Sequence, residues 1–145
     1  MELDSLSTLI ALTLGVGWAS GINLYAAVLA LGLAGTTGYA DLPTGLEVVE
    51  NPFVIAAAGV MYLVEFCADK IPGVDSGWDA LHTFIRLPAG ALLASGIVGD
   101  QGPVMEALAG LAGGGLAAST HAAKAGGRAL INTSPEPFSN WAASI

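Results

Sequence analysis

The feature that most constrains the fold is a long stretch without charge, since no Asp, Glu, Lys, Arg or His occurs between Ser5 and Ala40. Its apolar part, roughly residues 6–34, exceeds the ~20 residues that a membrane-spanning helix needs. The whole chain agrees, because 54% of its 145 residues are hydrophobic and only 11% are charged, against about 25% charged residues in soluble domains. We therefore expect an all-α, polytopic membrane protein that forms a single integral membrane domain over residues 1–145.

Three further hydrophobic segments follow, at about residues 52–68, 77–98 and 104–130, and a polar tail occupies residues 131–145. Asn51 and Pro52 are typical of a helix start, as an N-cap followed by proline at the first helical position. We expect the helices at 6–34 and 104–130 to be kinked or broken, because Gly15 to Asn23 and Gly113 to Gly115 are rich in small or polar residues.

The two broken helices also carry a faint internal repeat. Gly15, Ala19 and Ser20 recur 99 positions later as Gly114, Ala118 and Ser119. This similarity fits a weak inverted repeat of the kind found in transporters. Chance similarity between glycine-rich helices fits it too, and we favour that alternative.

Charge and motifs exclude several classes of function. The formal net charge of −8 argues against nucleic-acid binding. The single cysteine, Cys67, has no partner for a disulfide or a zinc finger. The sequence contains no P-loop, nucleophile elbow or zinc-protease motif, so we expect no cofactor and no resident metal, and we rank an enzyme last.

The cationic residues predict an orientation, because Lys and Arg are enriched in cytoplasmic loops. Lys70, Arg86, Lys124 and Arg128 all fall on one side of a four-helix arrangement. This predicts cytoplasmic termini and an external acidic loop at residues 35–51.

Two sets of polar residues are candidates for a transport path or a proton relay. Glu65 and Asp69 share a helix face, since they are four residues apart. Asp75, Asp79, His82 and Arg86 form a stripe along the next helix. Asn23 is the polar residue to watch in the first helix. A solvated helix end for Glu65, and a salt-bridge ladder for the stripe, are the structural alternatives.

A second stripe consists of His121, Lys124 and Arg128, which could bind an anion or a lipid headgroup. We favour the alternative that Lys124 and Arg128 only set the topology. Gly17, Gly21, Gly110 and Gly114 match the small-xxx-small pattern of helix packing.

Four blocks carry a family resemblance: 17–25 (GWASGINLY), 64–72 (VEFCADKIP), 78–86 (WDALHTFIR) and 131–141 (INTSPEPFSNW). In these blocks the chain resembles the domain of unknown function 4126 family. The resemblance implies a small, mostly bacterial integral membrane protein, and so the bacterial inner membrane, but no activity. Family members often continue past the last block with hydrophobic sequence, so either this chain is a short form or a segment is missing.

The function that we favour from the sequence is an oligomeric transporter or channel for a small solute or ion, with proton coupling through Glu65 or His82. The expected partners are the lipid bilayer, further copies of the chain, and a small solute, ion or anionic lipid. The alternative is a non-transporting binding or assembly protein that holds an anionic lipid or a partner.

Overall fold

The computed structural model describes residues 6–71 and 73–133. Within them the chain is helical and contains no strand, as the sequence predicts. The elements follow in the order α1 (Leu6–Thr36), η1 (Thr44–Glu50), α2 (Pro52–Ala68), α3 (Val74–Ile97), η2 (Gly99–Gln101) and α4 (Pro103–Asn132), where η marks a short 3-10 helix.

The expected helix at 52–68 has the same bounds as α2, whose N-cap is Asn51: the side chain accepts a hydrogen bond from the Phe53 amide. The helix expected at 77–98 begins three residues earlier, at Val74, after Gly73 with its positive φ of 87°. Glycine adopts this backbone conformation without strain, so the turn is sharp and α3 starts early.

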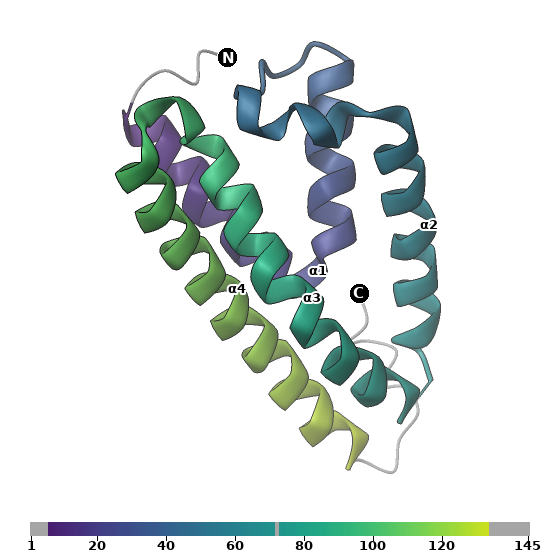
Figure 1. The fold of residues 1–145 in the computed structure, drawn as a ribbon. Coiled ribbons are helices and arrows are strands. Elements are labelled where there is room, and N and C mark those ends of the chain that lie inside the picture. The colour runs from purple at the N-terminus through teal and green to yellow at the C-terminus, as the bar shows by residue number, and fades with distance from the viewer. Residues whose placement is uncertain (1–5, 72, 134–145) are drawn as a thin grey trace.

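α1 is broken at Asn23, where φ is −150° and ψ is 96°. Figure 1 shows that the two arms, residues 6–22 and 24–36, form a V: the first arm descends to the middle of the bundle and the second returns. Packing agrees, because Leu9 and Leu31 contact one hydrophobic core cluster, although a straight helix would separate them by roughly 33 Å. The expected break in the first helix is therefore present, and it turns α1 into a helical hairpin.

This hairpin changes the expected topology. An external loop at 35–51 with a cytoplasmic N-terminus requires α1 to join opposite ends of the bundle. Instead, both ends of α1 lie at the same end of the bundle as η1 and η2, and the Thr44 hydroxyl donates to Asp100 across that end. The α2–α3 turn and the end of α4 lie at the other end. The sequence argument counted α1 as one crossing, and the orientation of its ends in a membrane stays a prediction.

The glycines at 113–115, where we expected a kink or break, lie within one continuous helix. Their role is close packing, since a Cβ at Gly113 would overlap Ala94 of α3, and a Cβ at Gly17 would lie 2.8 Å from the Gly113 Cα. Without side chains at these positions α4 approaches both α3 and the first arm of α1.

Within residues 6–71 and 73–133, two helices, α1 and α3, are long and apolar enough to cross a membrane by length and composition alone, or three if the bent pair of η1 and α2 is one span, although α1 reaches this length only across its break at Asn23. The fold is therefore that of an integral membrane protein.

The interior of the bundle changes from charged to apolar along α3. The first half of α3 buries Asp75, Asp79, His82 and Arg86, and the second half buries Leu93 and Ile97. One half of the bundle interior is apolar and the other half is charged.

Candidate functional site

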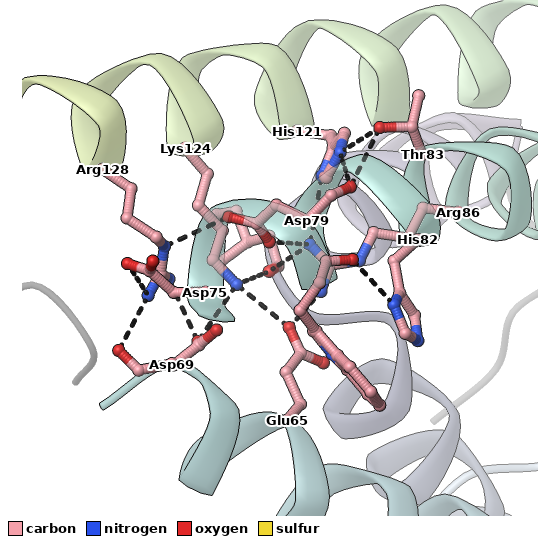
Figure 2. Close-up of polar contacts among 12 residues, drawn as sticks. Glu65, Asp69, Asp75, Asp79, His82, Thr83, Arg86, His121, Lys124 and Arg128 are labelled. Atoms are coloured by element: carbon pink, nitrogen blue, oxygen red, sulfur yellow. Dashed lines mark hydrogen bonds and ion pairs between the residues drawn. The ribbon is translucent and has the colours of Figure 1, made fainter. Parts of the chain in front are cut away.

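The charged half of the interior holds a compact cluster from three helices (Figure 2). We call it the charge cluster; its members are Glu65 and Asp69 of α2, Asp75, Asp79, His82 and Arg86 of α3, and His121, Lys124 and Arg128 of α4. These are the residues that the sequence singled out as two separate stripes and one carboxylate pair. The structure brings them together at one place, and all but Lys124 are buried.

Arg86 joins α3 to the other three helices. Its guanidinium is fully buried and donates to Glu65, and its Nη1 lies 3.7 Å from Asp79 Oδ1. The same Nη1 donates to the backbone carbonyls of Gly21 and Ile22 at 3.4 and 3.3 Å. Arg86 therefore pairs with carboxylates and also satisfies carbonyls that the break in α1 leaves free.

Lys124 lies at the same break. Its Nζ donates to the Ile22 carbonyl at 2.9 Å and to Glu65 Oε1 at 3.0 Å, and it lies 3.5 Å from Asp69 Oδ2. Because the first arm of α1 ends here, its C-terminal carbonyls carry the negative end of a helix dipole, which a cation stabilises.

Arg128 closes the cluster at the far end of α4. It donates to Asp69 Oδ2 at 3.0 Å and to the Asp69 carbonyl at 3.2 Å, and its Nε lies 3.1 Å from Asp79 Oδ2. Asp75 lies 3.9 Å from Arg128 and also accepts from the amides of Gly73 and Ser76, at the start of α3.

The formal charges of the cluster do not balance. It contains four carboxylates and three Lys or Arg side chains, so with both histidines neutral its net charge is −1. Among the described residues, Glu65 Oε2 and Asp69 Oδ1 are buried and have no hydrogen-bond partner. The cluster thus retains capacity for one more positive charge.

The two histidines occupy distinct positions. His82 Nδ1 donates to the Trp78 carbonyl at 2.9 Å, which leaves Nε2 to accept from the Tyr25 hydroxyl at 2.9 Å in the neutral tautomer. The ring also stacks on Trp78, with 4.3 Å between centroids. His82 therefore connects the second arm of α1 to α3.

His121 lies between Arg86 and the α3 backbone. Arg86 can only donate, so His121 Nδ1 accepts from it at 3.1 Å and Nε2 carries the proton that faces the Asp79 carbonyl at 3.0 Å. The Thr83 hydroxyl lies 2.7 Å from the same nitrogen. This pattern fits a neutral imidazole, which supports the charge count above.

Asn23 lies at the tip of the hairpin and caps its second arm. Its Oδ1 accepts from the Ala26 amide at 2.9 Å. The tip therefore combines carbonyls that accept from Arg86 and Lys124 with the N-terminus of the second arm, whose cap lies two residues before Tyr25.

The four candidate packing glycines lie against helices of the same chain. Gly17 and Gly21 face α4, and Gly110 and Gly114 face α3. These glycines therefore serve helix packing within the chain.

Two grooves reach the neighbourhood of the cluster. One, of about 420 Å³, lies between α3 and α4 and is lined by small residues together with Asp79, Thr83 and His121. The other, of about 360 Å³, lies between the second arm of α1, α2 and α3 and is lined by apolar side chains and Tyr25. Solutes or lipid could therefore approach from two sides.

The groups that sequence reasoning missed include Tyr25, Thr83 and the backbone carbonyls of Gly21 and Ile22. Tyr25 stands two residues after Asn23, and Thr83 lies four residues after Asp79, so spacing offered a weak signal for both. A backbone carbonyl has no signature in the sequence. The structure also groups Glu65, Asp69 and Asp79, whose candidate ligand oxygens all lie within 4.8 Å of one another.

Residues 10–145 match the family described as Domain of unknown function (DUF4126). No curated protein and no solved structure matches the chain. The chain belongs to this family, as the resemblance in its sequence indicated.

Proposed function

We propose that this member of the DUF4126 family is a membrane transporter or channel for a small solute or ion, whose path passes the charge cluster. Ionisable side chains within a membrane protein are costly to bury and are retained mainly for ion, proton or substrate pathways. The chain places four carboxylates, three cations and two histidines in one such interior site.

One observation carries the proposal: the broken tip of α1 meets the charge cluster. Arg86 donates to the carbonyls of residues 21 and 22 and Lys124 to that of residue 22, directly before the break in α1. Transporters commonly build ion and substrate sites from helix ends that are interrupted in the middle of the membrane. The interrupted helix and the charges together favour transport over a purely structural salt-bridge ladder.

The alternative, an anionic lipid held by His121, Lys124 and Arg128, has less support. Lys124 and Arg128 already pair with Glu65 and Asp69, and His121 is engaged by Thr83 and Arg86. An anion would have to displace these carboxylates. The cluster lacks one positive charge, so its electrostatics favour a cationic ligand or a proton.

Assembly into a homo-oligomer belongs to this proposal, because so few helices enclose a water-filled path poorly. Since the candidate packing glycines contact helices of the same chain, we place the contacts between copies on other faces. We propose the bacterial inner membrane as the location.

The test is ion flux in proteoliposomes, with H⁺, Na⁺ and K⁺ gradients as probes and a pH-sensitive dye inside. Glu65→Gln keeps the shape of the side chain and removes the charge that faces Arg86 and Lys124. We expect it to abolish flux of the transported ion and to leave the size-exclusion profile unchanged. The control is Glu47→Gln, at an exposed position of η1.

A wild-type protein that moves none of these ions faster than empty liposomes would refute ion transport. If flux is present and Glu65→Gln retains it, the path does not pass Glu65. Should Glu65→Gln fail to fold, His82→Gln tests the same path from the other side of Arg86, with flux again the readout.

A further inference from the structure

We infer that the oxygen atoms around Lys124 form a binding site for a small monovalent cation, such as Na⁺ or K⁺, which occupies it when the lysine ammonium moves out. The inference deepens the proposed function, on which it rests for its biological meaning, by naming the class of ligand. We call this group of atoms the oxygen cage; it consists of the Ile22 carbonyl, Glu65 Oε1 and Asp69 Oδ2.

The first argument is the chemistry of the cage. Its three oxygens come from a carbonyl and two carboxylates, and they surround Lys124 Nζ at 2.9, 3.0 and 3.5 Å. Carbonyl and carboxylate oxygens are the ligands that hard metal cations prefer. A lysine ammonium is a compact point charge. The structure therefore shows the cage already occupied by a monovalent cation that is attached to the protein.

The second argument is the set of oxygens still without partners. Glu65 is fully buried and Asp69 is 4% exposed, yet Glu65 Oε2 and Asp69 Oδ1 have no hydrogen-bond partner among the described residues. A buried carboxylate oxygen without a partner is costly. A metal ion can bind both oxygens of a carboxylate. An ammonium has three N–H groups, which are too few to donate to every oxygen of two carboxylates and a carbonyl.

The third argument is the freedom of Lys124 compared with its neighbours. Its side chain is 16% exposed, whereas the side chains of its ion-pair partners and of the two buried arginines are at most 6% exposed. Lysine has a long flexible stem and can carry its charge outward along apolar surface. The cation that is easiest to move is thus the one that fills the cage.

Charge balance selects a monovalent ion. With Lys124 in place the cluster carries a net charge of −1, and withdrawal of the ammonium makes it −2. Binding of a monovalent cation then returns the net charge of the cluster to −1, the value with Lys124 in place. Exchange between ammonium and ion would then be electrically neutral at the site.

The first experiment empties the cage by mutation. Lys124→Met keeps the length of the side chain and removes the ammonium, and thermal unfolding is measured in NaCl, KCl and choline chloride at equal ionic strength. We expect a saturable rise of about 4 °C or more in NaCl or KCl over choline, because an ion that binds only the folded state stabilises it. Lys124→Arg, which keeps a cation in the cage, and Lys70→Met, a lysine at the α2 end with its ammonium over Phe66, should show no such rise.

Equal unfolding temperatures of Lys124→Met in all three salts would overturn the inference. Stabilisation by Ca²⁺ or Mg²⁺ but not by Na⁺ or K⁺ would overturn its monovalent class.

The second experiment uses the wild-type protein and does not depend on the folding of a variant. The chain has two lysines, Lys70 and Lys124, so mass spectrometry can follow their reaction with an amine reagent separately. We expect NaCl or KCl to accelerate modification of Lys124 several-fold over choline chloride, with Lys70 unchanged. Equal rates at Lys124 in all salts would mean that no ion displaces the ammonium.

The readouts separate this inference from the proposed function. Saturable stabilisation or faster labelling without flux would support the cation site and refute transport. Flux without either binding signal would support transport and refute the site at Lys124.

Discussion

Arg86 should be the most important single side chain for the stability of this fold. It is fully buried, pairs with Glu65, and donates to the carbonyls of Gly21 and Ile22 at the tip of the α1 hairpin. We therefore chose Arg86→Met, which retains most of the apolar stem and removes the charge and every donor.

The expected loss follows from what the substitution leaves behind. Removal of one partner of a buried ion pair typically costs about 3–5 kcal/mol, because the other charge remains buried. For a chain of this size that corresponds to a fall in unfolding temperature of about 6–20 °C. Lys124 still neutralises Glu65 in part, so we expect the lower half of this range.

The assay is thermal unfolding of the purified protein in detergent, followed by intrinsic fluorescence and by loss of the size-exclusion peak. A double-mutant cycle with Glu65→Gln isolates the pair. The combined variant should lose at least about 1 kcal/mol less than the sum of the single variants, since residues in direct contact couple. Lys70→Met is the control for removal of a cation outside the charge cluster.

Two results would refute the reasoning. If Arg86→Met unfolds within about 1 °C of Lys70→Met, the buried pair contributes no net stability. If the losses of Arg86→Met and Glu65→Gln simply add, the two side chains do not act together.

Further predictions concern packing and topology. Gly113→Ala should destabilise the fold by about 1–3 kcal/mol, because the new Cβ would overlap Ala94 of α3. Gly115→Ala should stabilise it by about 0.5–1 kcal/mol, because the new Cβ meets nothing within 4 Å and alanine favours the helix. Thermal unfolding measures both changes. In a cysteine-free background, Ser7→Cys and Asp41→Cys should react with an impermeant thiol reagent from the same side of the membrane, and a cysteine in the α2–α3 turn from the opposite side. Labelling of positions 7 and 41 from opposite sides would show that α1 crosses the membrane.

The helices and the members of the cluster were largely predictable, because both depend on spacing along the chain. Asn51 and Pro52 fix the start of α2, and its bounds coincide with those expected. The spacings of four, three and four residues from Asp75 to Arg86 place their side chains on one face of α3, and that face is buried. Local rules of helix geometry suffice for statements of this kind.

The convergence of these stripes was not predictable, because it depends on contacts between distant segments. Lys124 and Arg128 follow the same sequence pattern whether they face lipid headgroups or pair with Glu65 and Asp69. The hairpin in α1 is similar: Gly17, Gly21 and Asn23 fit a kink, a break or a close helix contact equally well. The packing of α1 against α4 decides between these three possibilities. This packing cannot be predicted from the sequence of either helix alone.

The ion pairs also affect which cations bear on the orientation of the protein in the membrane. The positive-inside rule concerns cations near the ends of spans, where they interact with the membrane surface. Arg86, Lys124 and Arg128 pair with buried carboxylates inside the bundle, whereas Lys70 lies just after the end of α2. Applied to Lys70, the rule predicts a cytoplasmic α2–α3 turn. Because both ends of the α1 hairpin lie at the other end of the bundle, the same rule then predicts that these two ends are external, opposite to the sequence expectation for the N-terminus, and the cysteine labelling proposed above decides between the two orientations.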